Sequence, residues 1–238
     1  MSGETSRHDR RTTAAGVSPE PGGGMGVHSS TALLPVGSLL DSVAAETPAP
    51  GGGSVSALAG ALGAALAAMV CRLTAARGAP DMTAGEAAVL TAELDDLRGR
   101  LLAGFDIDQE AYEGILRALR LPKETEEERT QRREAVAAAT RHATLVPLEN
   151  ARLCVRVLEV CGAVVASGLP QAVTDAGVGA AVAFAGVQGA LYNVLVNLGG
   201  LDDPGFAATV RAEAAALAGA AEEARGRADA GVRRSIGA

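Results

Sequence analysis

Apolar side chains recur every three to four residues through most of the chain after residue 31, which is the spacing of one face of an α-helix. No alternation typical of β-strands competes with this pattern. It predicts an all-α protein, a helical bundle in which Pro147 breaks or kinks the fourth of six helices. These helices are expected over residues 33–46, 55–76, 83–120, 125–167, 174–198 and 204–230.

Hydroxyl and acidic residues mark where these helices begin. Ser and Thr are favoured at the N-cap, and a Glu three residues later completes a capping box. Two capping boxes are predicted, Thr83 with Glu86 and Thr125 with Glu128. Single N-caps are expected at Ser38, Ser54 and Thr174.

Two stretches without charge, residues 47–71 and 176–201, are long enough to cross a bilayer. They consist mainly of Ala, Gly and Val with interspersed Ser, Gln and Asn, and neither has basic residues flanking one side. A helix that is apolar all round is also what the centre of a soluble bundle requires. We therefore expect a central buried Ala/Gly-rich helix and no membrane span, with a membrane-associated bundle as the alternative.

Residues 1–31 are mostly Ser, Thr, Gly, Pro and Arg, and they lack the apolar core of a signal peptide. Such a segment buries too little apolar surface to offset the entropy of ordering. We predict a disordered N-terminal tail over 1–31, followed by one all-helical domain over 32–238.

Composition excludes several classes of protein. Only five residues are aromatic, which argues against a β-sandwich or barrel. The 28 acidic and 21 basic residues give a net charge of −7 with no basic stripe, so nucleic acid is not an expected partner. The three cysteines, Cys71, Cys154 and Cys161, have neither disulfide nor zinc spacing, which predicts reduced, buried thiols, a cytoplasmic protein and no metal site.

Asp108 interrupts the apolar stripe of the helix predicted over 83–120. Asp108 follows the apolar positions of this stripe at a spacing of three to four residues, whereas Asp106 and Glu110 point to the opposite side as solvated charges. A core-facing carboxylate is costly unless it is paired or lines a cavity, and burial raises its pKa toward the range useful for proton transfer. The stripe fits a catalytic carboxylate and a buried Asp satisfied by a partner helix equally well. Its apolar members are Leu90, Leu94, Leu97, Leu101, Phe105, Tyr112, Ile115 and Leu119.

Two further segments could hold a ligand. At the start of the helix predicted over 55–76, free N–H groups would attract an anion, although a structural turn explains the same residues: Gly51, Gly52, Gly53 and Ser54. One face of the helix over 174–198 could hydrogen-bond to the polar edge of a ligand. It could equally form a close helix crossing in which the two amides find hydrogen-bond partners within the protein. This face comprises Gly179, Val182, Gly186, Gly189, Asn193 and Asn197.

Seven short segments occur together in a specific order over about residues 33–230. They are Thr47–Val55, Leu62–Leu66, Asp106–Tyr112, Leu121–Thr125, Val146–Glu149, Thr174–Val178 and Asn193–Leu198. In these segments the chain resembles the cyclodeaminase/cyclohydrolase family, which comprises the C-terminal half of formimidoyltransferase-cyclodeaminase and its stand-alone bacterial relatives. Family members usually carry a Lys-rich segment where this chain has residues 75–80, with Arg77 as the only charge.

The resemblance implies an all-helical, homodimeric enzyme that acts on a tetrahydrofolate derivative and holds no permanently bound cofactor. The first expected activity is cyclodeaminase, which closes 5-formimidoyltetrahydrofolate to 5,10-methenyltetrahydrofolate and releases ammonia. The alternative is cyclohydrolase, which opens the methenyl ring to 10-formyltetrahydrofolate. An alternative of another class is a diverged, non-catalytic helical module that binds a ligand.

The resemblance also implies roles for single residues. Asp108 matches the family's acidic position and would relay protons. Gly51, Gly52, Gly53 and Ser54, together with Lys123, become candidates for contact with folate or its anionic glutamate tail. Candidates to hold the polar edges of the pterin are Asp175, Asn193 and Asn197.

Overall fold

The computed structural model describes residues 30–237, which form six α-helices, two short 3₁₀ turns and no β-strand. The all-α prediction is therefore confirmed. Nearly all of the predicted tail, residues 1–29, lies outside the described residues. The helices are α1 (Val36–Val43), α2 (Gly52–Arg77), α3 (Ala84–Leu119), α4 (Glu126–Ser167), α5 (Val173–Leu198) and α6 (Pro204–Ile236).

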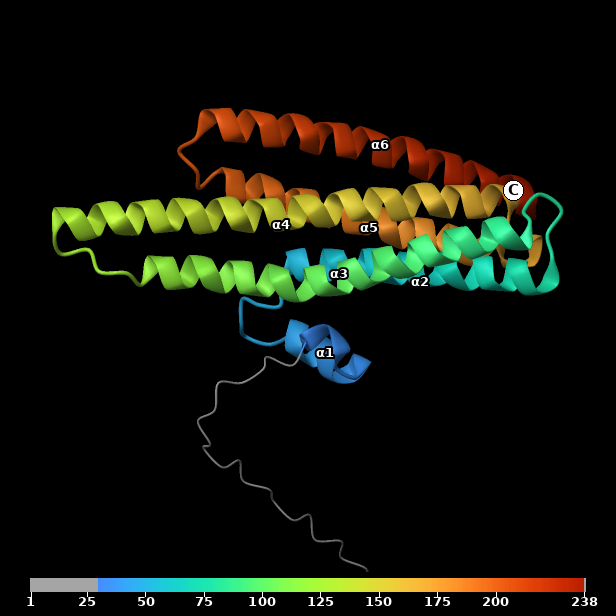
Figure 1. Cartoon of the computed structure of the whole chain (residues 1–238), viewed down its shortest axis with the longest axis horizontal. Helices are drawn as coiled ribbons and strands as arrows, with labels where there is room; N and C mark the ends of the chain where they lie inside the picture. The colour runs from blue at the N-terminus through green and yellow to red at the C-terminus, as the bar shows by residue number, and fades with distance from the viewer. Residues whose placement is uncertain (1–29, 238) are drawn as a thin grey trace, which may run out of the picture.

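The five long helices lie side by side along the long axis of the molecule, and α1 lies outside them, joined to α2 by a loop (Figure 1). Helix α2 packs against α3, α4 and α5, and half of its 26 residues are buried. This confirms the prediction of a central Ala/Gly-rich helix. Helices α3 and α4 extend past the beginning of α2, so their connecting turn projects from one end of the bundle (Figure 1).

Glycine allows α2 and α5 to approach until their backbones touch. A Cβ atom on Gly63 would lie 2.7 Å from the carbonyl oxygen of Gly179, and one on Gly186 would lie 2.8 Å from that of Ser56. Real Cβ atoms do not come this close to a backbone oxygen, so no larger residue fits without moving a helix. The small residues noted in the sequence therefore serve a close helix crossing along most of α5.

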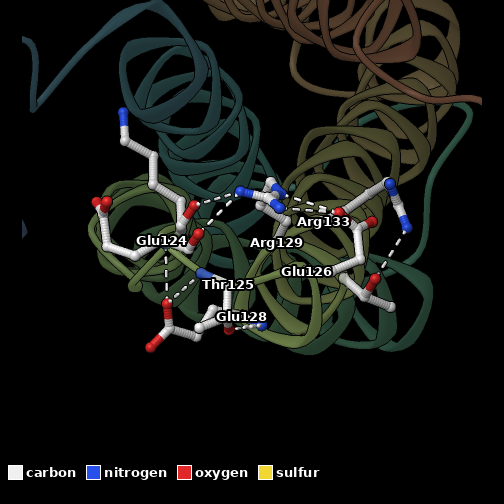
Figure 2. A network of polar contacts seen from close by, with 8 residues as sticks. Glu124, Thr125, Glu126, Glu128, Arg129 and Arg133 are labelled. Carbon is white, nitrogen blue, oxygen red and sulfur yellow. Dashed lines mark hydrogen bonds and ion pairs between the residues drawn. The ribbon is translucent and has the colours of Figure 1, made fainter.

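Both predicted capping boxes are present, at Thr83 with Glu86 and at Thr125 with Glu128. At the start of α4, the Glu128 carboxylate accepts from the backbone N–H groups of Glu124 and Thr125 (2.8 and 3.0 Å), and Arg129 reaches back to the preceding turn (Figure 2). These contacts hold the projecting turn between α3 and α4 in one conformation.

The three single N-caps were wrong, because each helix begins before the residue predicted to cap it. Pro35 precedes α1, Gly51 precedes α2, and the 3₁₀ turn Pro170–Ala172 leads directly into α5. Ser38, Ser54 and Thr174 consequently lie inside their helices. Helix α4 also continues through Pro147 without a break, and α6 runs to Ile236, beyond the predicted end.

Helices α2 and α5 are long and apolar enough to span a membrane by length and composition alone, with 61% and 44% of their most apolar windows buried in the bundle. Their outward residues form an apolar surface that we call the α2/α5 face. It comprises Val55, Leu62 and Met69 of α2 with Val178, Tyr192, Leu195 and Val196 of α5, all more than a third exposed.

Candidate active site

Asp108 lies in the C-terminal half of α3 and faces the first turn of α2. Its Oδ2 atom accepts a hydrogen bond of 2.9 Å from the Ser54 hydroxyl, and Ser54 is fully buried. A Cβ atom on Gly53 would overlap the Asp108 carboxylate, so glycine lets the carboxylate rest directly against the α2 backbone. The predicted inward direction of Asp108 is thus confirmed, and its partner is the segment Gly51–Ser54.

Burial raises the pKa of Asp108 above its ordinary value, and hydrogen bonds from the hydroxyl and backbone N–H of Ser54 offset part of that rise. The low-dielectric surroundings favour the protonated form, whereas the N–H groups at the beginning of α2 favour the carboxylate. A carboxyl group balanced in this way can both take and return a proton, which is what general acid–base catalysis requires.

Asn193 joins this cluster from α5. A Cβ atom on Gly52 would lie 3.3 Å from Asn193 Nδ2, so the amide stands against the start of α2. Asn193 Nδ2 donates to the carbonyl oxygen of Gly189 (2.8 Å), and its side chain is half-buried. The N-cap residue Gly51 has no side chain to cap α2, and the Ser54 N–H binds Asp108, which leaves the N–H groups of Gly52 and Gly53 for a ligand. Asp108, Gly51–Ser54 and Asn193 form the candidate site.

Asn197 has a structural partner instead. Its Nδ2 atom donates a 2.8 Å hydrogen bond to the carbonyl oxygen of Ala143 in α4. In an unbroken helix that oxygen would accept from the N–H of residue 147, which is proline and has none. Asn197 therefore replaces the hydrogen bond that Pro147 removes, and this explains how α4 runs through a proline.

The structure does not bring Lys123 or Asp175 together with Asp108. Lys123 is exposed in the projecting turn, where Arg129 binds its carbonyl oxygen, and the α3 segment from Asp108 to Leu119 alone spans about 17 Å. Asp175 is at the opposite end of α5 from Asn193, about 27 Å away at 1.5 Å per residue. Their predicted contacts with folate stay predictions.

Asp106 was wrongly predicted to be a solvated charge. It is half-buried and accepts hydrogen bonds from the Ser30 hydroxyl and from the backbone N–H of Thr31, the latter 3.0 Å long. The periodicity of α3 could not reveal this, because the partner segment precedes α1. Glu110 is exposed, as predicted.

The cysteines take no part in the candidate site. All three are free and buried, as predicted, and burial raises the pKa of Cys154 and Cys161 to about 12 and that of Cys71 to about 11. They stay protonated near neutral pH and are poor nucleophiles. Within residues 30–237, no three His, Cys, Asp or Glu side chains gather as metal ligands would.

We expect Asn197→Ala to lower the free energy of unfolding by about 1–3 kcal/mol, because it leaves the buried Ala143 carbonyl without a donor. In a Pro147→Ala background the same substitution should cost about 1 kcal/mol less, because residue 147 regains its N–H. Urea unfolding of the four proteins measures both costs. An equal cost in the two backgrounds would show that Asn197 does not serve the proline.

Asp108→Asn should leave the midpoint of thermal unfolding at pH 7 unchanged or raise it. Because the pKa of Asp108 is raised in the folded state, ionisation costs stability as the pH rises through that folded-state pKa. Asn can still accept from Ser54 and cannot ionise, so the variant avoids this cost. The advantage should fade as the pH falls toward 3.8, the ordinary pKa of Asp. Calorimetry between pH 4 and 7 tests this, and a variant less stable at pH 7 than at pH 4, relative to the parent, would contradict it.

Known proteins similar to this chain identify its family. The family described as formiminotransferase-cyclodeaminase matches residues 35–216. A methenyltetrahydrofolate cyclohydrolase of Methylorubrum extorquens is 38% identical over 168 residues, which cover 71% of this chain and 81% of that protein. The formimidoyltransferase-cyclodeaminase of Sus scrofa is 32% identical over 192 residues, which cover 81% of this chain but only 36% of that longer protein.

The fold has a counterpart among solved structures. The crystal structure of formiminotetrahydrofolate cyclodeaminase from Thermotoga maritima superimposes with a TM-score of 0.75, over 86% of this chain and 98% of that chain, at 24% sequence identity. This likeness establishes the shared fold, and the family match covers most of α1 to α6. The chain therefore belongs to the formiminotransferase-cyclodeaminase family.

Proposed function

We propose that the protein is a folate one-carbon enzyme that hydrolyses 5,10-methenyltetrahydrofolate to 10-formyltetrahydrofolate, with Asp108 as its catalytic acid and base. The observation that carries the proposal is the half-buried carboxyl group of Asp108 against the first turn of α2, where Ser54 binds it. Cyclodeaminase was the first activity expected from the sequence. The cyclohydrolase relative is matched at higher identity and over most of its length, and this favours hydrolysis.

Hydrolysis needs one proton acceptor and one proton donor in succession. The Asp108 carboxylate takes a proton from water as the oxygen bonds to the bridging carbon, which gives a neutral tetrahedral adduct. The carboxyl group then returns that proton to N5 as the carbon–N5 bond breaks. The hydroxyl proton of the adduct leaves to solvent, and the formyl group stays on N10. A single half-buried carboxyl group with a raised pKa can serve both steps.

Cyclodeamination is the second candidate, because the Sus scrofa relative matches 81% of this chain. In that reaction N10 attacks the carbon of the protonated formimidoyl group and loses its proton to the Asp108 carboxylate, which gives a neutral adduct that carries an amino group. The same proton then passes to the departing nitrogen, which leaves as ammonia while the methenyl bridge forms. The two reactions differ in the attacking group and in the leaving group, whereas the demand on Asp108 is the same.

The groups around Asp108 would orient the substrate. The amide of Asn193 would face a polar edge of the pterin, and the segment Gly51–Ser54 would offer backbone N–H groups to an anionic or carbonyl group. Lys123, exposed in the projecting turn, would meet the distant glutamate end rather than the reacting carbon. The contact of Asp175 with folate stays a prediction. A cytoplasmic location stays a prediction.

The expected effect of Asp108→Asn is a loss of turnover of about 10²–10⁴-fold, since Asn cannot exchange a proton near neutral pH. Absorbance of the methenyl chromophore follows both assays, with methenyltetrahydrofolate consumed in one and formimidoyltetrahydrofolate converted in the other. Glu110→Gln, an exposed position on the same helix, is the matched control and should keep the parent rate.

Near-parental turnover of Asp108→Asn would refute the catalytic role. Turnover of the formimidoyl substrate alone would establish the second candidate, and turnover of neither by the parent protein would favour the non-catalytic module.

We also propose that the chain forms a homodimer through the α2/α5 face. This face is uncharged and borders the candidate site, because Val55 and Tyr192 lie next to the segment Gly51–Ser54 and Asn193 respectively. Seven exposed apolar side chains on two neighbouring helices are typical of an interaction surface. The second copy would cover the side chains that make α2 and α5 resemble membrane spans.

Light scattering in detergent-free buffer should give twice the chain mass of 23.7 kDa. Leu62→Glu should shift the protein to monomer, because it buries a charge in the dimer interface. Val89→Glu, on the exposed side of α3, is the control and should stay dimeric. A monomeric parent protein would contradict the dimer, and a requirement for detergent would instead support a membrane surface.

A further inference from the structure

Ser54 differs from three other buried hydroxyl groups of the bundle in the acceptor of its hydrogen bond. Ser56, Thr74 and Thr144 donate to backbone carbonyl oxygens one turn earlier in their own helices, as hydroxyl groups inside helices commonly do. Ser54 instead donates to Oδ2 of Asp108, a side chain of another helix, at 2.9 Å. Its hydroxyl is therefore committed to the reacting carboxyl group and not to the backbone of α2.

The hydrogen bond between Ser54 and Asp108 is protected from water at the donor end. Ser54 has no exposed surface, so water does not compete for its single hydroxyl proton. The bond joins a neutral donor to a carboxylate, and hydrogen bonds to charged groups are stronger than those between neutral groups. The missing side chain of Gly53 leaves the space that the carboxylate occupies. The two residues together fix the carboxyl group against α2.

Ser54 is also the residue that opposes the effect of burial on Asp108. Burial raises the pKa of Asp108, and hydrogen bonds from the Ser54 hydroxyl and backbone N–H lower it. The first turn of α2 contains no titratable side chain. Within the described part of the chain, the titratable side chains on the surrounding turns of α3, α4 and α5 are not among the causes of this pKa shift; they are Asp106, Glu110, Tyr112, His142, Glu149 and Tyr192.

We propose that Ser54 is a positioning residue for the reaction, whose hydroxyl holds the Asp108 carboxylate in the orientation from which it takes a proton. This inference rests on the proposed function, because it requires Asp108 to act as the base. The carboxylate must be ionised before it can accept a proton, and a hydrogen bond donated to Oδ2 stabilises the ionised form. Without the hydroxyl, the carboxyl group would turn more freely and would keep its proton to a higher pH.

Ser54→Ala removes the hydroxyl and keeps the backbone N–H. With the folate substrate that the parent converts, we expect kcat at pH 7 to fall about ten- to a hundredfold, the effect of one hydrogen bond to a charged group, while KM changes little. The pH at which kcat reaches half its maximum should rise, because the lost bond lowers the pKa of Asp108. Ser54→Cys keeps a weaker donor, should give intermediate values, and carries the comparison alone if Ser54→Ala does not fold.

Ser56→Ala is the matched control. It removes a buried hydroxyl from the same helix, but one that donates to the Gly52 carbonyl oxygen and not to Asp108. Its kcat and its dependence of kcat on pH should equal those of the parent. A loss of turnover in both variants would show a general effect of hydroxyl removal on α2 and would overturn the positioning role.

A measurement that needs no turnover separates this inference from the proposed function. The carbon-13 NMR signal of the Asp108 carboxyl group, assigned by its absence in Asp108→Asn, should titrate at higher pH in Ser54→Ala than in the parent and in Ser56→Ala. An unchanged titration midpoint in Ser54→Ala would overturn the inference, as would a parental kcat or a rise in KM alone. Failure of the proposed function would show instead as turnover that survives Asp108→Asn.

Discussion

Helices α2 and α5 meet backbone to backbone, with glycine on both sides of the crossing, as the positions of Gly63 and Gly179 show. Helix α2 also contacts α3 and α4, so three of the long helices pack around it. The close approach brings Asn193 beside Gly52, and the missing side chain of Gly53 lets the Asp108 carboxylate reach the α2 backbone. The candidate site thus depends on side chains that are absent as much as on those that are present.

The sequence was sufficient for the features that local chemistry decides. Helical periodicity predicted the bundle and placed Asp108 on the inward face of α3, because 3.6 residues per turn leave no other direction for that position. The capping boxes at Thr83 and Thr125 were predicted correctly, since each needs only residues within one turn. The family resemblance, now supported by the match over residues 35–216, added the class of enzyme.

Features that depend on distant partners were beyond the reach of the sequence pattern. Ser54 was predicted to cap α2, yet its hydroxyl donates to a carboxylate 54 positions further along the chain. Asp106 was predicted to face solvent, and a segment before α1 covers it. Asn193 and Asn197 share one helix face, so the sequence pattern does not distinguish them. In the structure Asn193 lies beside Gly52 of α2 in the candidate site, whereas Asn197 donates to the Ala143 carbonyl of α4.

The hydrogen bond from Asn197 to Ala143 also sets an order of events during synthesis. Helix α4 is complete in sequence at Ser167, but the gap that Pro147 leaves in its hydrogen-bond ladder is closed by a residue 50 positions later. Until the end of α5 leaves the ribosome and docks, the two halves of α4 are joined at a weak point. The N-terminal half of α4 is therefore fixed to the C-terminal half only when α5 is nearly complete, so this end of the bundle reaches its final packing late in synthesis.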